Sequence, residues 1–180
     1  IWECWTLLSA IAGFTSKILL SPIHLCDSFR NPALIAKMIS TLDHISNHRF
    51  INFYDYGWRE KEFRQYGYHF LPTKERVAKM REGIKIIQGF HSHDVFSFSG
   101  KYYNIDRAIC SPKPLGKIPL WMGETNVPEM TENIVEFADV FNSMPVSLEG
   151  FKEKMVVLKN TCDKQNRNFD SLGKSLETQI

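Results

Sequence analysis

The chain has 180 residues, of which 43% are hydrophobic and 23% charged, and its formal net charge is +2. This length supports one sizeable hydrophobic core, and the interspersed charges exclude the basic patch of a nucleic-acid-binding protein. No apolar run is long enough to span a bilayer, so we expect no membrane contact. The four cysteines are far apart and form no CxxC pair, which indicates reduced thiols in a cytoplasmic protein.

Predicted helices and strands alternate along the chain, which is typical of a parallel α/β architecture. The first predicted elements are a helix at 3–14, a strand at 17–25 with a bulge or end at Pro22, and a helix and strand within 28–58. A loop or short helix follows at 59–72, then a helix at 73–89 capped by Thr73, a hairpin of residues 95–98 and 101–105, and an extended connector at 110–117. The last predicted elements are a strand at 118–122, a helix from Pro128, a strand at 139–143, a helix capped by Ser147, and a strand just beginning at Leu176. The hairpin is expected to close through a two-residue turn, Ser99-Gly100.

The stretch from Ser28 to Trp58 gives the clearest helix–strand signal. Asn31 suits a helix N-cap, and Pro32 suits the first helical position, where its missing N–H costs nothing. Asn47 can take the left-handed conformation that ends a helix. The apolar stripe of this helix comprises Leu34, Ile35, Met38, Ile39, Leu42 and Ile45. The run from Arg49 to Tyr54 is short, apolar and aromatic, which predicts a buried strand.

Ligand sites in parallel α/β folds lie at the carboxyl ends of the strands. The strand from Arg49 to Tyr54 is followed directly by Asp55, Tyr56, Gly57 and Trp58. The sequence therefore predicts that these four residues lie where chemistry takes place. A packed aromatic strand end is the alternative interpretation.

Several motifs occur here in the order that a known protein family shows. They read FRNPALIAKM-STLD-IS--RF, GW---EF--YGY, F-GKYY-I--A-C-PKP, IPLWMG and ADVFN. Together they resemble the luciferase-like monooxygenase superfamily, and most closely its F420- or flavin-dependent oxidoreductases. The resemblance covers nearly the whole chain in collinear order.

This resemblance implies an eight-stranded (β/α) barrel of the TIM-barrel type, with residues 1–180 in a single domain. On that template the chain starts in the second helix and ends inside the eighth strand. The first two strands and the last helix would then be missing, so we expect a fragment or a shortened form. The resemblance also implies a homodimer.

The same resemblance implies an oxidoreductase that carries out hydride transfer or monooxygenation of a small organic substrate, with F420 or FMN as cofactor. Three segments match the cofactor-contacting regions of the family: Leu25, Cys26 and Asp27; Asp55, Tyr56, Gly57 and Trp58; and Gly123, Glu124, Thr125 and Asn126. Glu62 and Tyr66 match residues near the substrate entrance. His24 is the catalytic candidate, as a hydrogen-bonding group or proton relay.

Each of these roles has a structural alternative. His24 equally suits a cap at a strand end, and Cys26 suits a small packing residue better than a nucleophile. Residues 123–126 suit a phosphate-binding helix start, except that the charge of Glu124 repels phosphate, and a solvated loop is the alternative. The two substrate residues also suit a solvated helix face.

One strand end departs from the family pattern. Relatives read GxGAGW, where glycines let the backbone approach the cofactor, whereas this chain reads FYDYGW. Phe53, Asp55 and Tyr56 thus replace small residues. The alternative hypothesis is therefore a degenerate, non-catalytic barrel remnant that acts as a binding or assembly module.

No metal site is expected from the sequence. His91 and His93 have no third ligand at a suitable spacing, so we predict that they form a surface turn. Lys113 and Lys117 are predicted to be surface charges.

Overall fold

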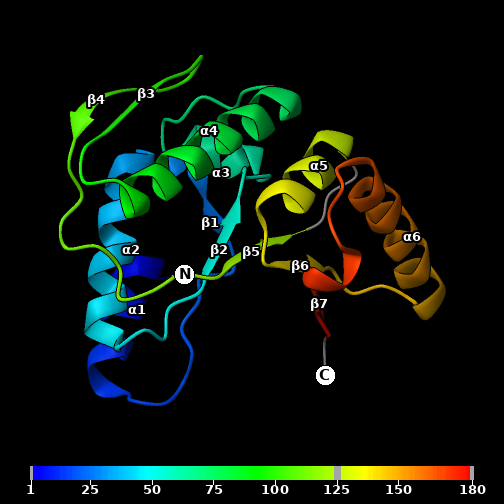
Figure 1. The fold of residues 1–180 in the computed structure, drawn as a ribbon, viewed down its shortest axis with the longest axis horizontal. Coiled ribbons are helices and arrows are strands. Elements are labelled where there is room, and N and C mark those ends of the chain that lie inside the picture. Colours follow the sequence, from blue (N-terminus) through cyan, green and yellow to red (C-terminus); the bar gives the residue numbers. More distant parts are fainter. Residues whose placement is uncertain (1, 124–126, 179–180) are drawn as a thin grey trace. The chain divides into compact units, whose positions relative to one another are not determined.

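The computed structural model describes residues 2–123 and 127–178, which form two compact units, residues 1–118 and 119–180. Each unit combines helices with parallel strands, as the sequence predicts (Figure 1). The single domain expected from the sequence remains a prediction. Within the described residues, no helix has both the length and the apolar character needed to cross a membrane.

The first unit contains two parallel strands, four α-helices and an antiparallel hairpin (Figure 1). Its elements are α1 (Cys4–Phe14), β1 (Leu25–Cys26), the 3-10 turn η1 (Asp27–Phe29), α2 (Pro32–Ser46), β2 (Asn52–Asp55), α3 (Glu60–Gln65), α4 (Thr73–Ser92), β3 (Phe96–Ser99) and β4 (Asn104–Ala108). Helix α2 packs against both α1 and α4. Pro72 rather than Thr73 occupies the N-cap of α4, so the predicted cap was wrong by one residue.

The second unit contains three parallel strands in the order β5, β6, β7. Its elements are β5 (Leu120–Gly123), α5 (Pro128–Phe137), β6 (Val140–Ser143), α6 (Leu148–Lys164), the 3-10 turn η2 (Phe169–Ser171) and β7 (Gly173–Leu176). The predicted cap of α6 is confirmed, because the Ser147 hydroxyl accepts a hydrogen bond from the Gly150 amide at 3.1 Å. The last strand ends at Leu176, where the sequence predicted a beginning, because the small and polar run from Gly173 has no apolar strand signal.

Both ends of α2 are as predicted, but its buried face is not. The Asn31 side chain accepts a hydrogen bond from the Ala33 amide at 2.9 Å, and Asn47 has φ 54°. The buried residues of this helix are Pro32, Ile35, Ala36, Ile39, Ser40, Leu42, Asp43 and Ser46. Leu34 and Ile45 are 53% and 49% exposed, so they lie outside the buried face. Spacing alone overestimated the stripe, because it counted every apolar residue as buried.

The predicted strand at 17–25 is mostly absent. Leu20 forms an isolated parallel bridge with Phe50, and only Leu25 and Cys26 pair continuously with β2. Pro22 lies between these two points and has no N–H to donate to a neighbouring strand. The ladder therefore breaks into a bridge and a two-residue strand.

The hairpin closes through a longer turn than predicted. Four residues, 100–103, separate β3 from β4, and the Gly100 amide donates to the Tyr103 carbonyl at 2.9 Å. The Glu82 carboxylate of α4 accepts the amides of Lys101, Tyr102 and Tyr103 at 2.8, 2.9 and 3.2 Å. A carboxylate from a distant helix thus fixes the turn. The spacing of residues within the hairpin could not predict this contact.

Candidate functional site

The carboxyl ends of β1 and β2 meet in the first unit. The strands run parallel with Leu25 opposite Tyr54 and Cys26 opposite Asp55. Because side chains alternate along a strand, Leu25 and Tyr54 point to one face, and Cys26 and Asp55 point to the other. The His24 ring meets the Phe53 ring edge-on at 4.3 Å, which places His24 on the same face as Asp55.

Asp55 is the buried carboxyl of this face. Its Oδ1 accepts a hydrogen bond from the Gly57 amide at 2.6 Å. Burial raises the pKa of Asp55, and the Gly57 amide and the charges of His24 and Arg76 oppose that rise. A carboxyl whose pKa is raised keeps its proton to a higher pH, so an imidazole and a carboxyl of increased proton affinity lie together at this strand end.

Gly57 is required by its protein neighbours. It has φ 80°, and a Cβ at this position would lie 2.5 Å from Cys26 Sγ and 2.7 Å from the Phe63 ring. Burial raises the pKa of the Cys26 thiol to about 12, so the thiol stays protonated and acts as a packing group. Cys26 and Phe63 thus fill the space where a side chain would lie, and the approach of a cofactor to this backbone remains a prediction.

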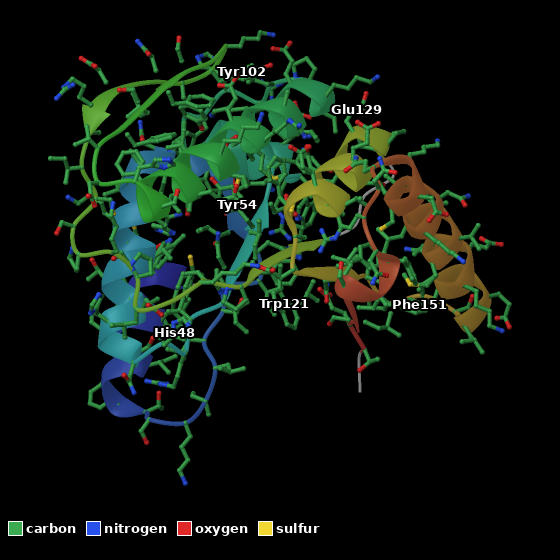
Figure 2. All side chains as sticks on the ribbon, viewed as in Figure 1. His48, Tyr54, Tyr102, Trp121, Glu129 and Phe151 are labelled. Carbon is green, nitrogen blue, oxygen red and sulfur yellow. The ribbon has the colours of Figure 1, made fainter. Side chains whose placement is uncertain are left out.

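Asp27 points away from this face, toward α4. Asp27 is 0% exposed, and its two carboxyl oxygens accept the hydroxyls of Tyr54 at 2.6 Å and Tyr103 at 3.1 Å. Figure 2 labels Tyr54 in the first unit, close to β2 and α4. Gly83 of α4 lies so close that any Cβ there would collide with the carboxyl group. A ligand at the strand end can therefore reach only the backbone of Asp27, and its predicted cofactor contact remains a prediction.

The other predicted strand-end residues differ in exposure. Leu25 and Tyr56 are buried, and Tyr56 lies 5.5 Å from the Arg76 guanidinium. Trp58 is 62% exposed, with the Arg59 guanidinium 4.9 Å over its ring. Trp58 is therefore open to solvent, whereas Tyr56 is a packing residue.

The two predicted substrate residues lie at α3, directly after this strand end. Glu62 is half-buried within the helix, and Tyr66 follows its last residue with 73% of its surface exposed. In the second unit Gly123 ends β5, and Glu124, Thr125 and Asn126 lie outside the described residues. The structure thus brings together the segments 24–27, 55–58 and 60–66, and the contacts predicted for these residues remain predictions.

Two further predictions were wrong for one residue each, His91 and Lys113, whereas His93 and Lys117 are exposed. His91 lies in the last turn of α4, half-buried, with Nε2 3.0 Å from the Ala36 carbonyl, so it is not part of a surface turn. Lys113 donates to the carbonyls of Phe90 and His93 and so caps the end of α4. Both side chains are held by helix carbonyls that sequence spacing does not reveal. Among residues 2–123 and 127–178, no three His, Cys, Asp or Glu side chains are arranged to hold a metal ion.

Sequence reasoning missed Arg76, whose guanidinium donates to the Gly57 carbonyl at 3.0 Å. It occupies the first turn of α4, immediately before Val77 on the apolar stripe, and it is buried. An arginine beside the apolar stripe of a predicted helix was the available signal. That signal alone does not identify the acceptor.

Comparison with known proteins adds to this geometry. The model of the luciferase-like monooxygenase family matches residues 2–175. The chain is 37% identical over 92 residues to an FMNH(2)-dependent dimethylsulfone monooxygenase of Pseudomonas fluorescens, covering 51% of this chain and 25% of that protein. It is 31% identical over 121 residues to an F420-dependent glucose-6-phosphate dehydrogenase of Amycolatopsis mediterranei, covering 66% of this chain and 36% of that protein.

Solved structures of the same group have a similar fold. An F420-dependent secondary alcohol dehydrogenase in complex with an F420-acetone adduct superposes with a TM-score of 0.87 at 18% identity, over 97% of this chain and 53% of that chain. The present chain therefore spans about half the length of that enzyme, and shorter portions of the curated relatives. This enzyme and other solved structures with a similar fold are luciferase-like enzymes of the TIM-barrel type, which confirms the predicted fold class. The chain belongs to the luciferase-like monooxygenase family.

Proposed function

We propose that this chain is part of an oxidoreductase that uses F420 or reduced FMN to act on a small organic molecule. The relatives named above include both cofactor classes, one as a monooxygenase and the other as a dehydrogenase. The observation that carries the proposal is the polar face formed by Asp55, the last residue of β2, and His24, the residue directly before β1. In barrels of this type the carboxyl ends of the strands carry the active site.

The described residues fit a planar cofactor ring. The larger side chains that replace the family's small residues are engaged within the protein, since Asp55 faces the Gly57 amide and Tyr56 lies against Arg76. Phe53 is buried and meets the His24 ring edge-on. The half-buried imidazole of His24 and the exposed indole of Trp58 remain as groups that a flavin-type ring would contact.

The roles of the protein residues follow from this arrangement. When bound, the cofactor supplies the hydride or reacts with oxygen. Asp55 accepts the Gly57 amide on Oδ1 and can hold a proton on its other oxygen, Oδ2. His24 moves a proton between this carboxyl group and the reacting molecule, because its imidazole lies on the same face. Trp58 and Tyr66 are exposed aromatic side chains that would cover a bound cofactor from solvent.

Titration of the purified chain with FMN and with F420 tests the proposal. We expect binding of one cofactor in the micromolar range, seen as a change in its visible absorption or fluorescence. His24→Gln should retain this binding and lower turnover by about 100-fold, because proton transfer by a positioned side chain contributes an acceleration of that order. If neither cofactor binds at millimolar concentration, the proposal is wrong and the non-catalytic remnant becomes the better account. The homodimer and the cytoplasmic location remain predictions.

A further inference from the structure

Arg76 joins two segments of the first unit that are distant in the sequence. Its Nε donates to the Gly57 carbonyl at 3.0 Å, its Nη1 donates to the Leu71 carbonyl, and its Nη2 donates to Thr73 Oγ1 at 3.2 Å. The guanidinium lies 3.8 Å over the Phe70 ring and 5.5 Å from the Tyr56 ring. One side chain thus holds the backbone that follows β2 to the backbone that precedes α4.

The chemistry of the side chain suits this task. The guanidinium presents donors in a fixed planar fork, so it can hold two carbonyl groups at once and still stack on an aromatic ring. A lysine ammonium keeps the charge without that geometry. Arg76 is almost fully buried, so water does not compete for its contacts.

The position of Gly57 shows why this contact bears on the site. The Gly57 amide donates to Asp55, and its carbonyl accepts from Arg76, so both polar groups of this peptide segment are fixed. Trp58, the exposed aromatic residue of the candidate site, is the next residue along the chain. Arg76 does not itself lie among the groups that we expect to touch a cofactor.

We propose that Arg76 is a positioning residue, which fixes the backbone of residues 56–58 in the conformation that a flavin or deazaflavin ring meets at this strand end. This inference rests on the proposed function. The inference also implies that the loop preceding α4 and residues 56–58 move together, because the same guanidinium holds both.

The test compares wild type, Arg76→Ala, Arg76→Lys and the control Arg64→Ala. Arg64 is an exposed arginine that pairs only with Glu60 of its own helix at 2.6 Å in the described contacts. Amide hydrogen exchange of the cofactor-free chain is followed at residues 56–58 and at Leu25 and Cys26. Affinity for whichever of FMN and F420 binds to the wild type, and the visible spectrum of the bound cofactor, are then measured.

We expect both Arg76 variants to show exchange at residues 56–58 that is faster by about tenfold, and a Kd for the cofactor that is higher by about tenfold, the effect of losing one charge-assisted hydrogen bond. Exchange at Leu25 and Cys26 and all properties of Arg64→Ala should match the wild type. Millimolar guanidinium ion should restore cofactor binding and its bound spectrum to Arg76→Ala, since it can refill the vacated fork.

Three outcomes would overturn the inference. Unchanged exchange at residues 56–58 in both variants would show that other contacts fix this backbone. Wild-type affinity and spectrum in Arg76→Lys would show that charge suffices. Failure of the wild type to bind either cofactor would defeat the proposed function itself, and the inference with it, whereas normal wild-type binding with unaltered variants defeats the inference alone. If Arg76→Ala does not fold, Arg76→Lys decides the question.

Discussion

Gly57 illustrates how neighbouring side chains determine which residue a strand end can accept. Its φ of 80° is unfavourable for other residues, and Cys26 and Phe63 occupy the space where a Cβ would lie. We predict that Gly57→Ala lowers the free energy of unfolding by about 2 kcal/mol, since strained backbone and steric overlap add together. Urea denaturation measures this loss. Gly67→Ala is the control, because it shares the positive φ but has open space around it, so equal losses would show that steric overlap contributes nothing.

Asp27 links a buried carboxyl group to the pH dependence of stability. Burial raises its pKa above the ordinary value of 3.8, and Tyr54, Lys79 and Tyr103 oppose that rise. A carboxyl whose folded-state pKa is raised stabilises the fold fully below the unfolded pKa. This stabilisation is lost as the pH rises through the folded pKa.

We therefore predict that Asp27→Asn changes how stability depends on pH. Asparagine can still accept a tyrosine hydroxyl, but it cannot ionise, so the wild type should lose stability relative to the variant as the pH rises above the ordinary carboxyl pKa of 3.8. Urea denaturation at pH values below and above this pKa tests the prediction. The exposed Asp94→Asn serves as control, and parallel curves for Asp27→Asn and wild type would contradict the assignment.

At the scale of elements, an arginine in each unit caps the carbonyl groups at the end of a helix. Arg49, which precedes β2, donates to carbonyls at the end of α1, and Arg167, which precedes η2 and β7, donates to carbonyls at the end of α5. Each follows an asparagine with positive φ after the intervening helix, Asn47 at 54° and Asn166 at 55°. The two units therefore repeat one arrangement, although the sequence shows no exact repeat.

Arg49→Met should remove this cap from the first unit. The guanidinium makes five hydrogen bonds, to the carbonyls of Ala12, Thr15, Ile18 and Ser46 and to the Thr15 hydroxyl. We predict a loss of about 3 kcal/mol in the free energy of unfolding, because buried carbonyls then have no donor. Thermal and urea denaturation measure it, with the exposed Arg64→Met as control. A loss below that of the control would contradict the proposed role.

The hairpin depends on Glu82, whose carboxylate accepts three turn amides. Glu82→Gln leaves one carbonyl oxygen and adds an NH₂ group that cannot accept, so we predict that amide exchange at residues 101–103 rises by about tenfold. Glu75→Gln, on the same helix, is the matched control, since it contacts the hairpin only through side chains in the described contacts. Equal exchange in both variants would show that the turn is held in another way.

At the scale of the whole molecule, cofactor binding and stability are linked. A ligand that binds only the folded chain stabilises it by about 2.7 kcal/mol at 100 times its Kd. We therefore predict that FMN or F420, whichever binds, raises the midpoint of thermal unfolding by several degrees. AMP at equal concentration is the control, because it carries a phosphate without the ring. A shift that AMP reproduces would indicate phosphate binding alone.

The sequence by itself determined the alternation of helices and strands, the caps at Asn31, Asn47 and Ser147, and the family. These features depend on residues close together in the chain or on motifs in a fixed order, so they can be predicted from the sequence alone. It also placed Asp55 directly after a strand, where ligand sites of such folds lie, and His24 near the end of another predicted strand.

Only the tertiary structure decided what these residues touch. Asp27 turned toward two tyrosines, one of them 76 residues away, and Glu82 reached a turn about 20 residues further on. Arg76 and Arg49 donate to carbonyl groups of other segments. A glycine is needed at position 57 because Cys26 lies where a Cβ would be. A buried polar group needs a hydrogen-bond partner, and the fold can supply that partner from any part of the chain. The spacing of residues in the sequence therefore does not reveal which partner it will be.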